Sequence, residues 1–133
     1  RANKFGRVSD YLARVDAETT VILQLETASA VAQAEAIGAV DGVSGVFFGP
    51  ADIAADIGLV GQPMNLAVWD LIRPAAKALM AKGVPVGTLV MDPDFAADLL
   101  NEGFTFVACG SDTGLLAKAS DTLLSAVKNK LEG

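Results

Sequence analysis

Short apolar runs alternate with longer amphipathic segments along this chain of 133 residues. The runs are rich in Val, Phe and Leu and lack the strict alternation of a half-exposed strand, which is typical of strands buried on both faces of a parallel sheet. The segments between them carry apolar residues at helical spacing. Strands separated by helices favour an α/β fold built from βα units. The predicted strands are residues 21–26, 43–49, 84–90 and 104–109.

Caps and breakers set the bounds of the helices. Ser, Thr, Asn and Asp accept hydrogen bonds from free amides at helix starts, proline fits the first helical turn, and glycine ends a helix. Pro74 falls inside a predicted helix, where it removes one backbone hydrogen bond and should bend the helix. The predicted helices are a short one after Ser9, 28–37 behind Thr27, 51–57, 66–82 between Asn65 and Gly83, one between Asp92-Pro93 and Gly103, and 113–131.

Two carboxylates follow two successive predicted strands. Glu26 ends the strand 21–26, and Asp52 closes the sequence Gly49-Pro50-Ala51-Asp52 behind the strand 43–49. The carboxyl ends of parallel strands meet at one edge of a sheet, where β/α proteins bind metal ions and substrates. A carboxylate at the end of a buried strand is costly unless its charge is compensated. A divalent cation would compensate both, although Glu26 could instead cap the next helix or pair with a lysine.

The residues around the two carboxylates fit an oxygen-ligated cation and a small acid. Mg²⁺ and Mn²⁺ take oxygen ligands and commonly need only one or two protein carboxylates. Gln24 lies two residues before Glu26, so both side chains project to the same face of the strand. The turn into the helix at Ala51 and Asp52 leaves backbone N–H groups free, which suits a substrate carboxylate. Alternatively, Gln24 is an interior polar residue that its neighbours satisfy.

Composition narrows the class of protein. Apolar residues make up 52% of the chain, and 16 acidic against 10 basic residues give a net charge of −6. This balance argues against nucleic-acid binding, which depends on basic patches. Apolar stretches end before the roughly 18 residues of a membrane span, and no signal peptide is recognisable, so we expect a cytoplasmic enzyme part without a membrane partner. The one cysteine, Cys109, should be a buried apolar residue rather than part of a disulfide or zinc site.

Six sequence blocks carry a resemblance to a known family. They are RANKFGR at 1–7, QLET at 24–27, VSGVFFGPAD at 43–52, GTL at 87–89, GFTFVA at 103–108 and DTGLLA at 112–117. With these blocks the chain resembles the HpcH/HpaI family, the metal-dependent class II pyruvate aldolases that cleave 4-hydroxy-2-oxo acids. The order of the blocks matches the family, and every block belongs to the second half of the family's barrel.

The resemblance implies that residues 1–133 form the C-terminal half, four βα units, of a TIM (β/α)8 barrel. A complete barrel needs about 250 residues, and this chain begins at Arg1 without an initiator Met. Four strands buried on both faces would also leave an open sheet edge. We therefore expect a complementary N-terminal half of the barrel to exist, as a cleaved segment, a separate chain or a region outside this sequence.

The resemblance also implies the chemistry. The expected reaction is retro-aldol cleavage of a 4-hydroxy-2-oxo acid to pyruvate and an aldehyde, with Mg²⁺, Mn²⁺ or Co²⁺ as a Lewis acid. The family's pattern makes Glu26 and Asp52 the metal ligands and lets Gln24 hydrogen-bond the pyruvate moiety. It places the substrate carboxylate on the Ala51 and Asp52 amides. Leu89 would form an apolar wall beside the aldehyde, although plain core packing explains Leu89 nearly as well.

The family's catalytic residues are expected outside this chain. In the family, an arginine and a histidine–aspartate pair belong to the first half of the barrel, and this chain has no histidine. We therefore predict no catalytic residue in this half and no activity of the isolated chain. In the family the last helix packs on a neighbouring subunit of a hexamer built from trimers, so the resemblance also implies a homo-oligomer.

Two rival interpretations stay open. One is a related metal-dependent C–C lyase of the citrate-lyase or malyl-CoA type, which also gathers a Glu and an Asp at strand ends. The other is a non-catalytic half-barrel that only binds a partner. The segment QPMNLA at 62–67 departs from the family's usual sequence, and nothing in this half defines the aldehyde part of the substrate.

Overall fold

A four-stranded parallel sheet forms the centre of the computed structural model, which describes residues 3–131. The strands pair in chain order, β1-β2-β3-β4, with helical segments between them. This is the arrangement of consecutive βα units in half of a (β/α)8 barrel, so the predicted α/β fold is confirmed. The strands are β1 Ile22–Leu25, β2 Gly45–Phe48, β3 Val86–Val90 and β4 Phe106–Cys109.

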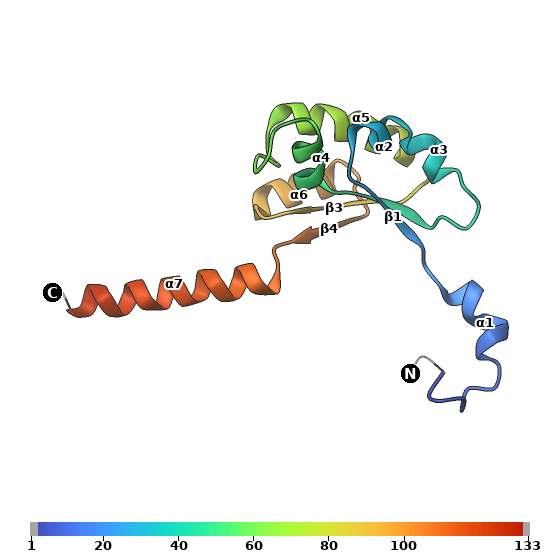
Figure 1. Ribbon diagram of the computed structural model, residues 1–133, viewed down its shortest axis with the longest axis horizontal. Coiled ribbons are helices and arrows are strands. Elements are labelled where there is room, and N and C mark those ends of the chain that lie inside the picture. The colour runs from blue at the N-terminus through green and yellow to red at the C-terminus, as the bar shows by residue number, and fades with distance from the viewer. Residues whose placement is uncertain (1–2, 132–133) are drawn as a thin grey trace.

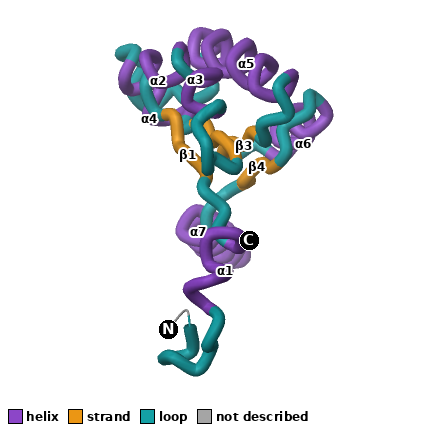
Figure 2. The backbone as a smooth tube through the Cα atoms, turned by 90° about the vertical axis from the view of Figure 1, so that its right-hand side faces the viewer, coloured by secondary structure: helices purple, strands orange, loops and turns teal. Residues whose placement is uncertain are grey.

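Seven helices occur in the described residues: α1 Tyr11–Glu18, α2 Ala28–Ala32, α3 Ala34–Gly38, α4 Pro50–Asp56, α5 Leu66–Ala81, α6 Pro93–Asn101 and α7 Asp112–Leu131. Helices α2 to α6 cover one face of the sheet, whereas α1 and α7 extend away from it (Figure 1). Figure 2 shows the same one-sided arrangement from the side. Arg1 and Ala2, which open the first matching block of the sequence, lie outside the described residues.

Side-chain caps open three helices where the sequence predicted them. The side chains of Thr27, Asn65 and Asp92 each accept a hydrogen bond from a backbone amide two or three residues further on, at 2.8 to 3.1 Å. The prediction for Ser9 is wrong, because Asp10 is the residue that precedes α1. Asp10 makes no side-chain cap bond, since its carboxylate accepts from Arg14 at 3.1 Å.

The predicted helix 28–37 is interrupted at Gln33, which separates α2 from α3. The Gln33 side chain donates from Nε2 to Ser29 O at 3.1 Å. It thereby takes the carbonyl that an unbroken helix would offer to the Gln33 amide. That amide donates to Ala30 O instead. Helix α5, by contrast, is continuous across the exposed Pro74, and the bend expected there stays a prediction.

The main core lies between the sheet and the helices that cover it. Val46 and Phe48 of β2 are fully buried there, together with Ile72 and Leu79 of α5. Burial of side chains of this size stabilises the fold by about 1.5–3 kcal/mol each. Thr88 is the buried polar side chain of this layer, and its hydroxyl donates to Phe48 O at 3.0 Å. This bond joins β2 to β3 close to their carboxyl ends.

The opposite face of the sheet carries apolar side chains with no helix over them. The strand register aligns Gln24, Phe47, Gly87 and Phe106 in one row across the sheet. The rings of Phe47 and Phe106 stack with centroids 5.9 Å apart, and a Cβ at Gly87 would overlap the Phe106 ring. Leu89, two residues after Gly87, is 40% exposed on this face. It is the face that would line the interior of a closed barrel.

Helix α7 extends beyond the sheet and buries none of its residues (Figure 1). Its apolar side chains are therefore exposed in this chain. Cys109 is also exposed, so the prediction of a buried cysteine is wrong. It lies on the helix side of β4, two residues after Val107, and α7 does not fold back to cover it. Among residues 3–131, no helix combines the length and the hydrophobicity that a membrane span requires.

We predict that Gly87→Ala lowers the free energy of unfolding by about 1 to 3 kcal/mol, because the added methyl group must displace the Phe106 ring. Urea unfolding followed by circular dichroism measures this loss. Phe106→Leu, added to Gly87→Ala, should recover part of the stability, since it removes the ring that the methyl group meets. An unfolding free energy that Gly87→Ala leaves unchanged would contradict the packing described here.

Candidate functional site

The predicted site residues gather at the edge of the sheet where the parallel strands end. Glu26 directly follows β1, and Gly49 directly follows β2 as the N-cap residue of α4. The Gly49 amide donates to Leu25 O at 3.0 Å, so the pairing of β1 with β2 continues past the strands. Asp52 lies in the first turn of α4. The two carboxylates thus follow neighbouring strands, as the sequence predicted.

Three polar side chains converge on Gly49. Gln24 Nε2 donates to Glu26 Oε1 at 2.6 Å. A Cβ placed on Gly49 would lie 3.1 Å from Glu26 Cγ, 3.5 Å from Gln24 Nε2 and 3.6 Å from Asp52 Oδ2. The three side chains therefore surround the space that a larger residue at position 49 would fill. The structure brings together the residues that the sequence singled out as metal ligands and as the pyruvate-binding amide.

The donor set fits a hard cation, although its environment differs from the sequence-based expectation. Glu26 and Asp52 are exposed, whereas the strand pattern predicted a buried Glu26. Glu26 is exposed because its side chain projects to the same face of the sheet as Gln24, and no helix of the described residues covers that face. Within residues 3–131, no three His, Cys, Asp or Glu residues come close enough to hold a metal ion together. Two carboxylates with an amide beside them leave other positions to water or substrate, which suits Mg²⁺ or Mn²⁺.

A cavity of about 700 Å³ opens beside these side chains. Its volume is within the range of small-molecule sites. Gln24, Ala51, Asp52 and Leu89, the residues predicted to bind substrate, all line it. Glu26 lies next to the cavity, through its hydrogen bond with Gln24, and does not form part of its wall. Leu89 contributes an apolar wall and is not packed in the core.

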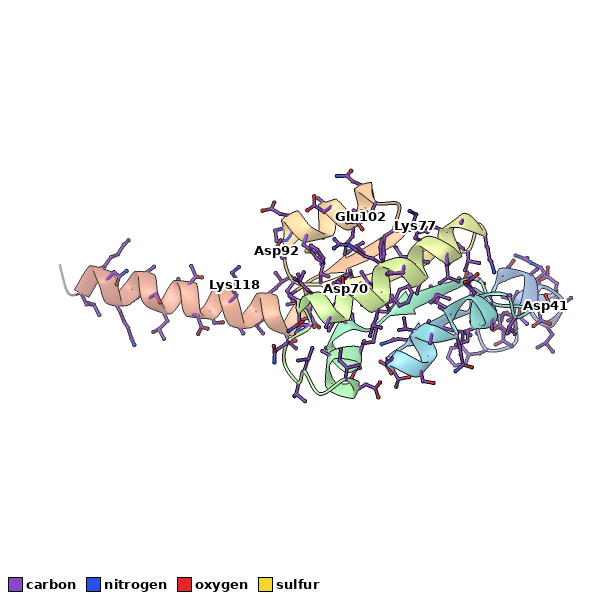
Figure 3. All side chains as sticks on the ribbon, turned by 90° about the horizontal axis from the view of Figure 1, so that it is seen from above. Asp41, Asp70, Lys77, Asp92, Glu102 and Lys118 are labelled. Atoms are coloured by element: carbon purple, nitrogen blue, oxygen red, sulfur yellow. The ribbon has the colours of Figure 1, made fainter. Side chains whose placement is uncertain are left out.

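The cavity wall also includes residues that were not predicted as site residues. Pro63 and Met64 belong to the connection between α4 and α5, and Trp69 Nε1 donates to Pro63 O at 2.9 Å, which ties this connection to the core. Asp92 and Lys118 also line the cavity, and Figure 3 labels Asp92 beside α6 and Lys118 on α7. No sequence pattern indicated Lys118 at this place, because its position depends on the path of α7.

A second hydrogen bond joins the end of β1 to α4. Asp56, the last residue of α4, accepts from Ala28 N through Oδ2 at 2.8 Å. Ala28 is the first residue of α2 and lies two residues after Glu26. Asp56 was not among the site residues that the sequence predicted. The signal that could have found it is its spacing of four from Asp52, which places both carboxylates on one face of a helix.

Known proteins match this chain over nearly its whole length. A sequence model of the HpcH/HpaI aldolase/citrate lyase family matches residues 3–119. The chain is 44% identical over 123 residues to a pyruvate aldolase of Rhizobium etli, which covers 92% of this chain and 48% of that protein. It is 43% identical over 123 residues to a 4-hydroxy-2-oxovalerate aldolase of Rhodococcus jostii, again over 92% of this chain and 48% of the relative.

A solved structure shows the same fold. A HpcH/HpaI aldolase/citrate lyase family protein from Burkholderia cenocepacia matches this chain with a TM-score of 0.89 at 33% identity, over 96% of this chain and 50% of that one. The chain spans about half the length of the curated relatives it matches.

Proposed function

The chain belongs to the HpcH/HpaI aldolase/citrate lyase family, and from this membership we propose that it supplies the metal site and part of the pyruvate site of an aldolase. The reaction is cleavage of a 4-hydroxy-2-oxo acid to pyruvate and an aldehyde. The names of the relatives indicate an aldolase or lyase. The observation that carries the proposal is the convergence of Gln24, Glu26 and Asp52 on Gly49, beside the cavity of about 700 Å³.

Glu26 and Asp52 are the proposed ligands of a divalent cation, Mg²⁺, Mn²⁺ or Co²⁺, because carboxylate oxygens suit such ions. When bound, the cation supplies a Lewis acid that stabilises the negative charge developing on the pyruvate half as the C3–C4 bond breaks. Gln24 orients the Glu26 carboxylate by donating one N–H to it at 2.6 Å. A primary amide has a second N–H, which we assign to the keto acid.

The other proposed roles concern the position of the substrate. The amides of Ala51 and Asp52 lie in the first turn of α4, where backbone N–H groups have no partner within the helix. They are the proposed donors to the substrate carboxylate. Leu89 lines the cavity from β3 and is 40% exposed, so its side chain is available to an apolar part of the aldehyde. These assignments, with that of Gln24, give a role to four residues of the cavity wall.

We assign the proton transfer to residues outside this chain. A retro-aldol cleavage needs a general base for the C4 hydroxyl proton, and this chain contains no histidine. The exposed apolar face with Phe47, Phe106 and Leu89 supports a complementary N-terminal half of the barrel as the partner, since such a face needs a cover in water. The cytoplasmic location stays a prediction from composition.

A citrate-lyase-type or malyl-CoA-type C–C lyase is the second candidate, because the description of the matched family joins aldolases with citrate lyases. Such an enzyme of the CoA type would act on a thioester, whereas the aldolase would act on a free 2-oxo acid. Parallel assays of both substrate types with one preparation of the complete enzyme separate the two candidates.

Assembly of several copies is the further part of the proposal. Five apolar side chains of α7, Leu115, Leu116, Leu123, Leu124 and Val127, are between 50% and 71% exposed. An exposed apolar stripe of this length marks an interaction surface. We propose that α7 packs on a neighbouring subunit of a homo-oligomer, the hexamer that the family resemblance implies.

Glu26→Gln and Asp52→Asn should each remove activity without unfolding the protein. Both substitutions keep side-chain size and lose a ligand charge, so kcat/KM for pyruvate release by the complete enzyme should fall at least about a hundredfold. Both residues are exposed, so the thermal midpoint should stay near that of the wild type. Asp98→Asn, an exposed carboxylate on α6 outside the cavity wall, is the control. Full activity in excess chelator would refute the metal requirement.

Residues 1–133 expressed alone should release no pyruvate from a 4-hydroxy-2-oxo acid, because the proposed proton-transfer residues are elsewhere. The uncovered sheet face should also make the segment self-associate until the complementary half is added. A lactate-dehydrogenase-coupled assay and sedimentation measure the two effects. Metal-dependent turnover by the isolated segment would show that the catalytic residues lie within it.

The complete protein should sediment as a homo-oligomer, and charges on the apolar stripe of α7 should reduce its size. Leu116 and Leu123 are seven residues apart and share one face of the helix. The double substitution Leu116→Glu, Leu123→Glu should therefore shift the protein to smaller species. Ser125→Glu, on the opposite face of α7, is the matched control. A strictly monomeric wild-type protein would contradict the proposed assembly.

A further inference from the structure

Asp56 lies beside the candidate site and makes a tertiary hydrogen bond that has no role in the proposed reaction. Its Oδ2 accepts from Ala28 N at 2.8 Å. Ala28 begins α2, and the first amides of a helix have no acceptor within that helix. The N-cap residue Thr27 satisfies a different amide, that of Ala30, at 3.1 Å. Asp56 therefore supplies, from another helix, an acceptor that the turn after Glu26 lacks locally.

The position of Asp56 on α4 is unfavourable for a carboxylate considered alone. It is the last residue of α4, and the C-terminal end of a helix carries partial negative charge. The carboxylate instead meets the start of α2, where partial charge is positive. Asp56 is exposed, so removing its charge does not leave a buried polar group of α4 unpaired. The bond to Ala28 thus serves the placement of the turn more than the stability of the core.

Glu26 lies between two hydrogen bonds that join its segment to the β2–α4 unit. Before it, Leu25 O accepts from Gly49 N at 3.0 Å, and after it, Ala28 N donates to Asp56 at 2.8 Å. Asp52 stands one helical turn before Asp56 on the same helix. A movement of Ala28 relative to α4 would therefore change the distance between the Glu26 and Asp52 carboxylates. The hydrogen bond between Gly49 N and Leu25 O cannot alone prevent such a movement, because Glu26 comes after Leu25 in the chain.

We infer that Asp56 is a positioning residue, which sets the separation of Glu26 and Asp52 by holding the turn after β1 against α4. The inference rests on the proposed function, because it requires Glu26 and Asp52 to bind the cation. Asp56 does not belong to the ligand set, since its carboxylate is engaged by Ala28 N and no group of three acidic residues forms in the described part of the chain. A cation site depends on such supporting contacts for its affinity.

The test is the dissociation constant of Mn²⁺ for the complete protein without substrate. The electron paramagnetic resonance signal of free Mn²⁺ measures how much of the ion is bound. Asp56→Ala removes the acceptor and should raise the dissociation constant about tenfold. Asp56→Asn keeps an acceptor oxygen and should bind Mn²⁺ within about twofold of the wild type. Asp98→Ala removes an exposed carboxylate from α6 and is the matched control for charge, with no change expected. Thermal midpoints of all variants are measured in parallel.

The outcomes distinguish the inference from the proposed function. Wild-type affinity in Asp56→Ala would overturn the positioning role, and so would equal losses in Asp56→Ala and Asp56→Asn. A loss of affinity that follows a lowered thermal midpoint would overturn it as well, because the role would then be structural. Glu26→Gln is included to test the site itself. If Glu26→Gln binds Mn²⁺ as tightly as the wild type, the proposed metal site fails, and the inference fails with it.

Discussion

The close approach of two chain segments at Gly49 is the constraint on which the candidate site depends. The Gly49 amide donates to Leu25 O, so β1 and β2 stay paired up to the residue before Glu26. The missing side chain leaves the space around which Gln24, Glu26 and Asp52 converge. Proline at the next position starts α4 at once, because its fixed φ suits a first helical turn. A Cβ at position 49 would lie 3.1 Å from Glu26 Cγ, so the Glu26 side chain would have to shift by a few tenths of an ångström.

The two faces of the sheet are buried to different extents, and this difference leaves apolar surface uncovered on one of them. On the helix side, Val46 and Phe48 are fully buried, whereas on the other side Ile22 and Leu89 are 45% and 40% exposed. Helix α7 adds to the uncovered apolar surface, since it buries none of its residues. Apolar surface of this extent requires a cover in water. The proposed covers differ for the two surfaces: the complementary half of the barrel for the inner face, and a neighbouring copy for α7.

Local rules predicted the elements wherever the deciding interactions are local. Each observed strand begins and ends within two residues of its predicted bounds, because short runs rich in β-branched and aromatic residues and bounded by turn residues are typical of buried strands. Caps such as Thr27 and Asp92 were predictable for the same reason, since each bonds an amide within its own helix. The rules failed at Gln33, where a side-chain bond to Ser29 O competes with the helix.

By itself, the sequence determined the order of strands and helices, the family, and the two carboxylates at neighbouring strand ends, because these follow from periodicity and short motifs. Only the tertiary structure decided that Glu26 is exposed, that Asp56 reaches Ala28, and that α7 leaves Cys109 uncovered. These features depend on contacts, or on the lack of a covering helix, between segments far apart in the chain. No periodicity encodes them, because the distance between such segments is set by packing and not by spacing along the sequence.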